Sequence, residues 1–299
     1  MSRTITVGLD GSPESRAAAE WAAREAKLRG LALRLLHVWE PVPEPIARAP
    51  LPGAETHQNR SERIPRETAE GLRLRHPGVE VTAEHLAGRP SEVLGEAAGT
   101  TELLVLGSRG LSGIGGFLVG SVGLAVVAHA RCPVVLVRAG EQAADEHETD
   151  PAGIPSAATA YRPVVLGLDT GHLDASVIEF AFEEAARRDT GLRVVHAWNL
   201  PPYYLHGADL ERYDDVIHQQ ADELTGAVRP WREKYPSVEV VEVSRWGSPS
   251  EQLITASRAA SLVVVGRWIR RSPFGAHIGP VAHAVLHHAA APVAVVAHD

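Results

Sequence analysis

The sequence predicts an α/β fold made of two tandem doubly wound domains, and three observations point to it. Short apolar runs alternate with segments of helical periodicity, which is typical of βαβ units and parallel sheets. The same motifs recur at one constant spacing, and a stretch of small and acidic residues separates the two copies. A chain of 299 residues also suits two domains of about 150 residues each.

The first copy contains a regular series of strands and helices. Strands are expected at 5–9, 31–39, 79–86, 103–106 and 133–137, and helices at 13–28, 61–75, 91–99 and 121–130. Ser12 supplies a capping hydroxyl for the first helix, Pro13 suits its first position, and Gly30 ends it. Prolines between residues 41 and 52 predict an irregular loop.

The repeat keeps a constant offset of 159 residues. The recurring motifs are VGLD at 7–10 and LGLD at 166–169, HVW at 37–39 and HAW at 196–198, GRPSE at 88–92 and GSPSE at 247–251, and PV at 133–134 and 292–293. Chance does not keep one register across separated motifs, so the chain carries a duplicated domain. We expect domains at 1–139 and 162–299, joined by a linker at 140–161 that Pro151, Gly153 and Pro155 mark.

Composition narrows the function classes. A net charge of −8 argues against nucleic-acid binding, which needs a basic surface. No apolar stretch approaches 18 residues, so no membrane span is expected. The chain starts directly with a strand and shows no leader, which predicts a cytoplasmic location. Cys132 precedes Pro133 and a valine run, so we expect a buried structural thiol, not a nucleophile.

A glycine-rich stretch from Gly107 to Val122, GSRGLSGIGGFLVGSV, is the strongest functional signal. It follows an apolar strand and leads into a helix. Glycines let a backbone approach a ligand closely, and the N–H groups and dipole of a helix start favour phosphate. An ordinary flexible loop is the alternative interpretation. Neither a G-x-x-x-x-G-K-[ST] motif nor a G-x-G-x-x-G after the first strand is present.

The spacing that does hold is Gly107-x2-Gly110-x9-Gly120-Ser121. It resembles the nucleotide-binding pattern of the universal stress protein family in its ATP-binding branch, and the resemblance covers nearly the whole chain, twice over. It implies a five-stranded parallel sheet of order 3-2-1-4-5, flanked by helices, in each domain. It also implies ATP, together with Mg²⁺, in the first domain, and a stress-response or regulatory role. A slow ATPase or autophosphorylating enzyme is one alternative, and an interaction scaffold without nucleotide is another.

By this resemblance, the first site comprises Gly8, Asp10, Val38, Gly107, Arg109, Gly110, Gly120, Ser121 and Val122. Asp10 is expected beside the adenosine, and the backbone of Val38 at the adenine. The residues from Gly107 to Gly110 are expected around the ribose and phosphates, and those from Gly120 to Val122 are expected to donate to the phosphates. Asp10 and Gly107 lie at the carboxyl ends of two strands, directly after their last residues, where ligands of doubly wound sheets bind.

Several of these residues have a second interpretation. Asp10 suits a turn before the first helix, because Asp-Gly-Ser is common turn chemistry. Ser121 suits a helix N-cap, which is compatible with phosphate binding. Arg109 suits a solvated loop charge, although arginine geometry also matches phosphate.

The second domain departs from the pattern. Asp169, Gly266 and Gly279 keep their places, so we expect a degenerate second nucleotide site. Ile269 stands where Gly110 does and Pro280 where Ser121 does. A β-branched residue tolerates positive φ poorly, and proline lacks an N–H donor. Positive charge at Arg267, Arg270 and Arg271 offers partial compensation.

No catalytic residue and no metal site is predicted. The histidines at 283, 287 and 288 fit a helix face without a carboxylate or cysteine at ligand spacing. The apolar strands at 134–137 and 293–296 are expected at sheet edges, which need covering. Universal stress proteins generally pair through this strand, so we expect the two halves to pair within the chain, with a homodimer as a further possibility. Nucleic acid and membrane are not expected as partners.

Overall fold

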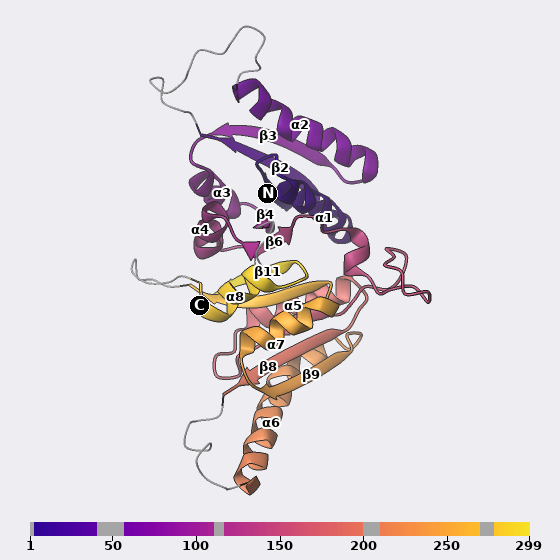
Figure 1. The fold of residues 1–299 in the computed structure, drawn as a ribbon, viewed down its shortest axis with the longest axis vertical. Coiled ribbons are helices and arrows are strands. Elements are labelled where there is room, and N and C mark those ends of the chain that lie inside the picture. The colour runs from indigo at the N-terminus through magenta and orange to yellow at the C-terminus, as the bar shows by residue number, and fades with distance from the viewer. Residues whose placement is uncertain (1–2, 41–56, 111–116, 200–209, 270–277) are drawn as a thin grey trace. The chain divides into compact units, whose positions relative to one another are not determined.

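The computed structural model describes residues 3–40, 57–110, 117–199, 210–269 and 278–299. Of residues 57–61, 109, 110, 117, 118 and 210–213 it describes the backbone alone. The chain divides into two compact units, Met1–Gln142 and Ala143–Asp299, and each is a sheet flanked by helices (Figure 1). Among the described residues, no helix has both the length and the apolar character that a bilayer crossing requires.

The first unit is built on a parallel sheet. Its strands are β1 Thr4–Leu9, β2 Ala32–Trp39, β3 Val81–Ala87, β4 Leu103–Gly110 and β6 Val134–Arg138. Their order is β3-β2-β1-β4-β6, with every neighbouring pair parallel. The short strand β5, Phe117–Leu118, pairs antiparallel with the end of β4. The predicted fold class and the strand order 3-2-1-4-5 are therefore confirmed for this unit.

Helices cover both faces of this sheet. They are α1 Pro13–Arg29, α2 His57–Arg75, α3 Pro90–Ala98 and α4 Ser121–His129. Helices α1 and α2 lie on one face, and α3 and α4 on the other (Figure 1). The start of α1 is as predicted, because the Ser12 hydroxyl accepts a hydrogen bond from the Ser15 N–H at 3.1 Å. Gly30 ends the helix with φ of 64°, a left-handed conformation that glycine adopts at little cost.

The second unit repeats this arrangement. Its strands are β7 Val164–Gly167, β8 Leu192–Trp198, β9 Val240–Trp246, β10 Leu262–Trp268 and β11 Val293–His298, in the order β9-β8-β7-β10-β11. Its helices are α5 Ala175–Arg187, α6 Leu210–Lys234, α7 Pro249–Ala256 and α8 Pro280–His288, with short 3₁₀ helices η1 Ala143–Glu146 and η3 Ser257–Ala259. All its sheet neighbours are parallel. The structure thus agrees with the duplication read from the sequence.

The segment predicted as a linker, 140–161, has local structure of its own. After η1, His147 forms an isolated β-bridge with Tyr161, and their rings lie 4.0 Å apart. A second bridge joins Thr149 and Pro155. Glu146 and His147 are buried, with 2% and 8% of their surface exposed. The linker boundaries remain a prediction.

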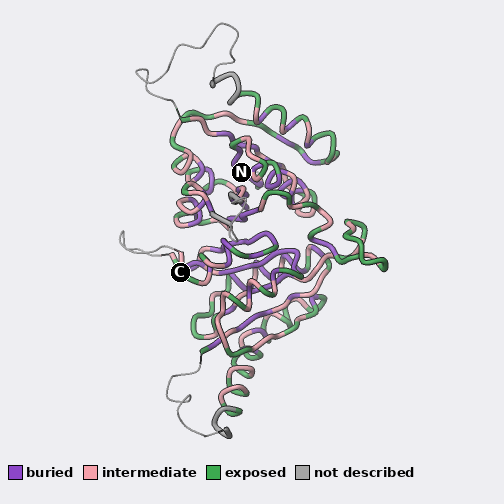
Figure 2. The backbone as a smooth tube through the Cα atoms, in the orientation of Figure 1, coloured by how far each residue is buried: buried purple, intermediate pink, exposed green. Residues whose placement is uncertain are grey.

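Apolar side chains on the strands form the core of each unit. Figure 2 shows that buried residues follow the strands and the helix sides that face them. The largest fully buried side chains include Trp21, Ile5 and Leu104 in the first unit, and Phe182, Leu166 and Leu192 in the second. Burial on both faces explains why these strands read as continuous apolar runs.

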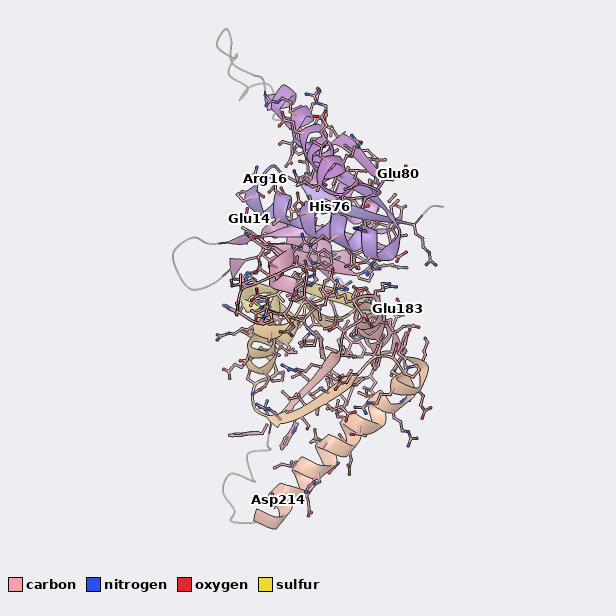
Figure 3. The ribbon with its side chains drawn as sticks, turned by 90° about the vertical axis from the view of Figure 1, so that its right-hand side faces the viewer. Glu14, Arg16, His76, Glu80, Glu183 and Asp214 are labelled. Atoms are coloured by element: carbon pink, nitrogen blue, oxygen red, sulfur yellow. The ribbon has the colours of Figure 1, made fainter. Side chains whose placement is uncertain are left out.

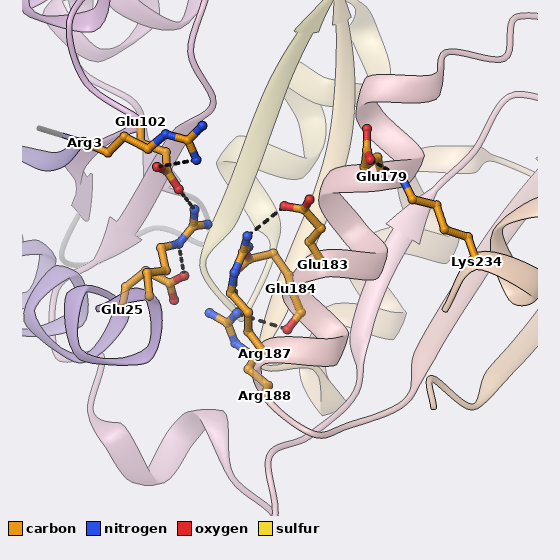
Figure 4. Close-up of polar contacts among 10 residues, drawn as sticks. Arg3, Glu25, Glu102, Glu179, Glu183, Glu184, Arg187, Arg188 and Lys234 are labelled. Carbon is orange, nitrogen blue, oxygen red and sulfur yellow. Dashed lines mark hydrogen bonds and ion pairs between the residues drawn. The ribbon is translucent and has the colours of Figure 1, made fainter. Parts of the chain in front are cut away.

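A buried ion pair lies at the C-terminal end of α1 in the first unit, and another at the equivalent end of α5 in the second. In α1, Arg29 Nε lies 2.6 Å from Glu25 Oε1, and the two side chains are 4% and 1% exposed. The pair Glu184 and Arg188, at the same places in the repeat, is fully buried (Figure 4). Arg187 also reaches Glu184, at 2.6 Å, and it contacts the more exposed Glu183 at 2.8 Å. A charge buried without its partner is costly, so each pair holds the end of its helix firmly in place.

We expect Glu184→Gln to lower the free energy of unfolding by about 3–5 kcal/mol, because it removes the buried carboxylate charge that Arg188 contacts. The matched control is Glu183→Gln, one residue earlier on α5. Its side chain is 39% exposed, so the expected loss is within about 1 kcal/mol. Urea unfolding of the full chain measures both. Equal effects of the two variants would contradict this account of the buried pair.

Candidate functional site

A cavity of about 240 Å³ opens at the carboxyl ends of β1, β2 and β4 in the first unit. Strand ends form its floor, and the starts of α1, α3 and α4 form its rim. Its apolar walls include Leu36, Leu94 and Leu106. This is the edge of a doubly wound sheet at which ligands bind.

Seven of the nine residues predicted for the first site line this cavity: Gly8, Asp10, Val38, Gly107, Gly120, Ser121 and Val122. The other two, Arg109 and Gly110, form the end of β4 and pair there with β5. The side chain of Arg109, like residues 111–116 with Gly113, Gly115 and Gly116, lies outside the described part of the chain. The fold therefore gathers residues that are up to 114 positions apart in the sequence.

Strand β4 is longer than the sequence predicts. The expected strand ended at Leu106, but β4 continues to Gly110, and its pairing with β6 reaches Ser108 opposite Arg138. Gly107 is thus a strand residue. A Cβ atom on Gly107 would lie 2.6 Å from the carbonyl carbon of Glu14 and 2.7 Å from the nitrogen of Ser15. The close approach of α1 gives this glycine a packing role, whatever it does for a ligand.

Asp10 begins a turn and also lines the cavity. Its Oδ1 accepts hydrogen bonds from the backbone N–H of Ser12 at 2.9 Å and from the Ser12 hydroxyl at 2.5 Å. The turn interpretation is therefore correct for the local backbone. The residue is nevertheless exposed on the cavity side, so the turn and a ligand contact are compatible.

The start of α4 presents backbone donors to the cavity. Gly120 is its N-cap, with extended φ and ψ of −62° and 157°, and makes no capping hydrogen bond through a side chain. Ser121 is the first helical residue, which differs from the interpretation of Ser121 as the cap. The first N–H groups of a helix have no intrahelical acceptor, and the helix dipole adds positive potential there. This end of the cavity therefore suits an anion.

Glu14 and Ser15 are among the lining residues that sequence reasoning did not assign. Both belong to the first turn of α1, and Figure 3 shows Glu14 and Arg16 together at the start of that helix. In the sequence, Glu14 suits a helix start because acids favour the first turn. The contact between α1 and Gly107, which only the fold reveals, brings both residues to the cavity.

A second cavity, of about 440 Å³, lies at the equivalent strand ends of the second unit. Asp169, Gly266 and Gly279, the three residues predicted for the degenerate site, all line it, and so does Pro280. Arg267 does not line it. That side chain is buried, its guanidinium donates to the carbonyl of Trp268 at 3.3 Å, and burial lowers its pKa. The predicted compensation by Arg267 is therefore not supported, and Arg270 and Arg271 lie outside the described residues.

Comparison with known proteins shows the family to which this chain belongs. The model of the universal stress protein family matches residues 1–138 and 160–297. The chain belongs to this family. A universal stress protein of Mycobacterium tuberculosis is 34% identical over 315 residues, covering 97% of this chain and 94% of the relative. The two matched segments show that this chain carries the family domain twice.

Solved structures of the family match as well. The crystal structure of a universal stress protein from Archaeoglobus fulgidus covers 100% of both chains, with a TM-score of 0.67 and 17% identity, and so shares the fold. A universal stress protein in complex with cAMP matches 46% of this chain and 98% of its own, at 25% identity and a TM-score of 0.36.

Cys132 and the potential metal ligands can be examined in the described part of the chain. Burial raises the pKa of the Cys132 thiol to about 11, so the group stays protonated at neutral pH. The described residues contain no group of three or more potential ligands that could hold a metal ion. On α8, the rings of His283 and His287 lie 4.4 Å apart on one helix face.

A pair of histidines lies on β2 and β3, and one of them stands between two residues that line the first cavity. His37 precedes Val38 on β2 and is 6% exposed, and its ring centroid is 5.3 Å from that of His85 on β3. Within the described chain, His37 Nδ1 and His85 Nε2 are buried without hydrogen-bond partners. Burial and the neighbouring His85 lower the pKa of His37, while Asp10 opposes this shift. The folded unit therefore favours the neutral form of His37.

This shift makes stability depend on pH. Since the pKa of His37 is lower in the folded chain, the unfolded chain binds the proton more readily. We expect the free energy of unfolding to fall as the pH drops below the ordinary histidine pKa of about 6.5. His37→Gln should make this fall shallower, whereas His218→Gln, at an exposed position, should not. Urea unfolding between pH 7.5 and pH 5 measures the slopes, and identical slopes for His37→Gln and the wild type would refute the assignment.

Proposed function

We propose that the first unit binds ATP, with its base and ribose in the cavity and its phosphates at the start of α4. The observation that carries this proposal is the meeting of two features in one cavity. One is an apolar recess at the strand ends, and the other is a helix start without side-chain capping. Membership of the universal stress protein family supports it further.

The apolar recess suits a flat base. Leu36 on β2 and Leu94 on α3 both line the cavity, and so does Val38, the next-to-last residue of β2. Apolar walls with a few polar groups at the rim are typical of small-molecule sites. The exposed carboxylate of Asp10 lies at that rim and provides an acceptor for ribose hydroxyls.

In this proposal the phosphates of ATP lie at the rim of the first cavity. Pockets that enclose whole ligands usually span about 300–1,000 Å³, so a cavity of about 240 Å³ takes the base and sugar but leaves the phosphates at the rim. There the N–H groups of the first turn of α4 and the Ser121 hydroxyl supply donors. Arg109 and Gly110, at the end of β4, belong to the same proposed site. Mg²⁺, which binds chiefly through phosphates and water, accompanies the nucleotide in this proposal.

The role that fits is a regulatory one, in which nucleotide occupancy reports a stress condition. The alternative is an interaction scaffold that binds no nucleotide, and an ATP-binding experiment distinguishes the two. The second unit contributes no equal ATP site in this proposal, because Pro280 removes an N–H from the first position of α8. Pairing between the two halves through their last strands stays a prediction.

A charge-reversing pair of variants tests the site. Gly120 and Gly279 are equivalent caps with φ of −62° and −65°, an extended conformation that any residue adopts. We expect Gly120→Glu to weaken ATP binding at least tenfold, because the added carboxylate repels phosphate and competes for the first N–H groups of α4, whose hydrogen bonds to a charged group contribute ~1.5–3 kcal/mol each. Gly279→Glu, the matched control, should leave the affinity unchanged. Calorimetry on the full chain, with circular dichroism to verify folding, decides. Undiminished affinity in a folded Gly120→Glu variant would disprove the assignment.

The number of sites is a separate prediction. If Pro280 and Ile269 disable the second phosphate cradle, the full chain should bind about one ATP. Equilibrium dialysis with radiolabelled ATP measures this number directly. Two ATP molecules per chain with similar affinities would show that the lost N–H and hydroxyl donors are not decisive.

A further inference from the structure

The second cavity keeps one side of the first almost unchanged. At the constant offset, Gly167, Asp169, Val195, Ala197 and Leu253 take the places of Gly8, Asp10, Leu36, Val38 and Leu94, and all ten residues line their cavities. Glycine and aspartate are kept, and each apolar position stays apolar. This is the side that the proposed function assigns to the base and ribose.

The opposite side has changed its chemistry. Trp268 stands in the place of Arg109, and Pro280 in the place of Ser121. Both line the second cavity, and Trp268 leaves 48% of its surface exposed there. An arginine and a serine offer donors to phosphate, whereas an indole offers mainly an apolar face and a proline has no N–H. The side that would hold phosphates thus lacks the arginine, the serine hydroxyl and the first helix N–H of the first unit.

Two histidines hold the indole in position. Trp268 and His298 are register partners at the ends of β10 and β11, and their ring centroids lie 4.7 Å apart. His172, from the loop before α5, meets Trp268 edge to face at 5.5 Å and 83°. His172 Nδ1 also lies 3.0 Å from Asp169 Oδ2. Three separate segments therefore build one aromatic wall beside the retained aspartate.

His298 supplies an independent sign of a ligand. Its side chain is 7% exposed and lines the cavity, and within the described chain its Nδ1 has no hydrogen-bond partner. The nearest carboxylate oxygen, on Asp174, is 3.8 Å away, beyond hydrogen-bond distance. Buried polar atoms are normally satisfied, so this nitrogen has capacity for a polar group of a bound molecule.

Gly266 also has a different neighbour from Gly107. A Cβ atom on Gly266 would lie 2.8 Å from His298 Nε2, whereas the equivalent atom on Gly107 would meet the backbone of α1. The glycine therefore makes room for the His298 ring. This packing contact is enough to explain why Gly266 is kept in the second unit, without any role in phosphate binding.

The charges that line the second cavity disfavour phosphate as well. Among its described lining residues, the groups that can carry charge are Asp169, Asp174, His172 and His298, and none is a lysine or arginine. Its volume of about 440 Å³ falls in the range of about 300–1,000 Å³ that encloses small ligands. The ligand that fits is uncharged and has a flat apolar part.

We propose that the second cavity binds a purine nucleoside that carries no phosphate. The base lies between Val195 and Leu253, and the ribose hydroxyls reach Asp169. Trp268 packs on the ribose, at the position where the phosphates of a nucleotide would extend from it. Trp268 is then the residue that sets the preference for nucleoside over nucleotide. The placement of the base rests on the proposed function of the first unit, whereas the exclusion of phosphate rests on the second cavity alone.

Two titrations of the full chain keep the two proposals apart. ATP alone reports on the first unit. Adenosine, titrated by calorimetry into chain saturated with ATP, then reports on the second cavity, and we expect one further molecule to bind per chain. Trp268→Ala should weaken this step roughly tenfold, because it removes the aromatic face on which the ribose is proposed to pack. Trp268→Phe, which keeps an aromatic face, should retain most of the affinity, and so verifies the fold.

Trp246→Ala is the matched control. Trp246 ends β9, is 55% exposed and does not line the cavity, so its removal should leave adenosine binding unchanged. Binding of a second ATP per chain, no further adenosine, or equal adenosine binding in Trp268→Ala and wild type would each overturn the inference. If ATP fails to bind but adenosine binds in a manner that depends on Trp268, the first proposal fails and this one stands.

Discussion

The missing side chain at Gly107 determines how closely α1 approaches the sheet. The backbone of Glu14 and Ser15 occupies the place that a Cβ atom would take. That contact brings the start of α1, with its Ser12 cap and the turn at Asp10, to the carboxyl ends of the central strands. The first cavity exists because helix and strand meet there without a side chain between them.

In the second unit the same backbone frame carries a different cavity. The strand order and the helix starts are repeated, but the ring of His298 lies over Gly266 and Trp268 replaces Arg109. The two units therefore have cavities at equivalent positions, but different side chains line them. Helix α4 begins with Ser121, whereas α8 begins with Pro280 and so lacks the N–H donor of that position.

Sequence reasoning predicted the repeat, the strand order and the start of α1, because capping and periodicity are local signals and the family resemblance supplied the topology. It ended β4 too early, because Gly107 and Gly110 read as a turn although the pairing with β6 extends to Ser108. It also left Glu14 and His298 out of the sites. Their side chains reach the cavities through contacts between distant segments, which no local pattern encodes. The substitution of Arg109 by Trp268 was visible at the constant offset, but its ring contacts required the fold.

We propose above all that the equivalent cavities of the two units bind different ligands, and that only the first binds ATP. Native mass spectrometry of the intact chain as purified from cells tests it most directly. The account predicts a bound species heavier than the bare chain by the mass of one ATP, with or without Mg²⁺, and no species with two. A chain that carries two nucleotides, or none even after incubation with ATP, would contradict it.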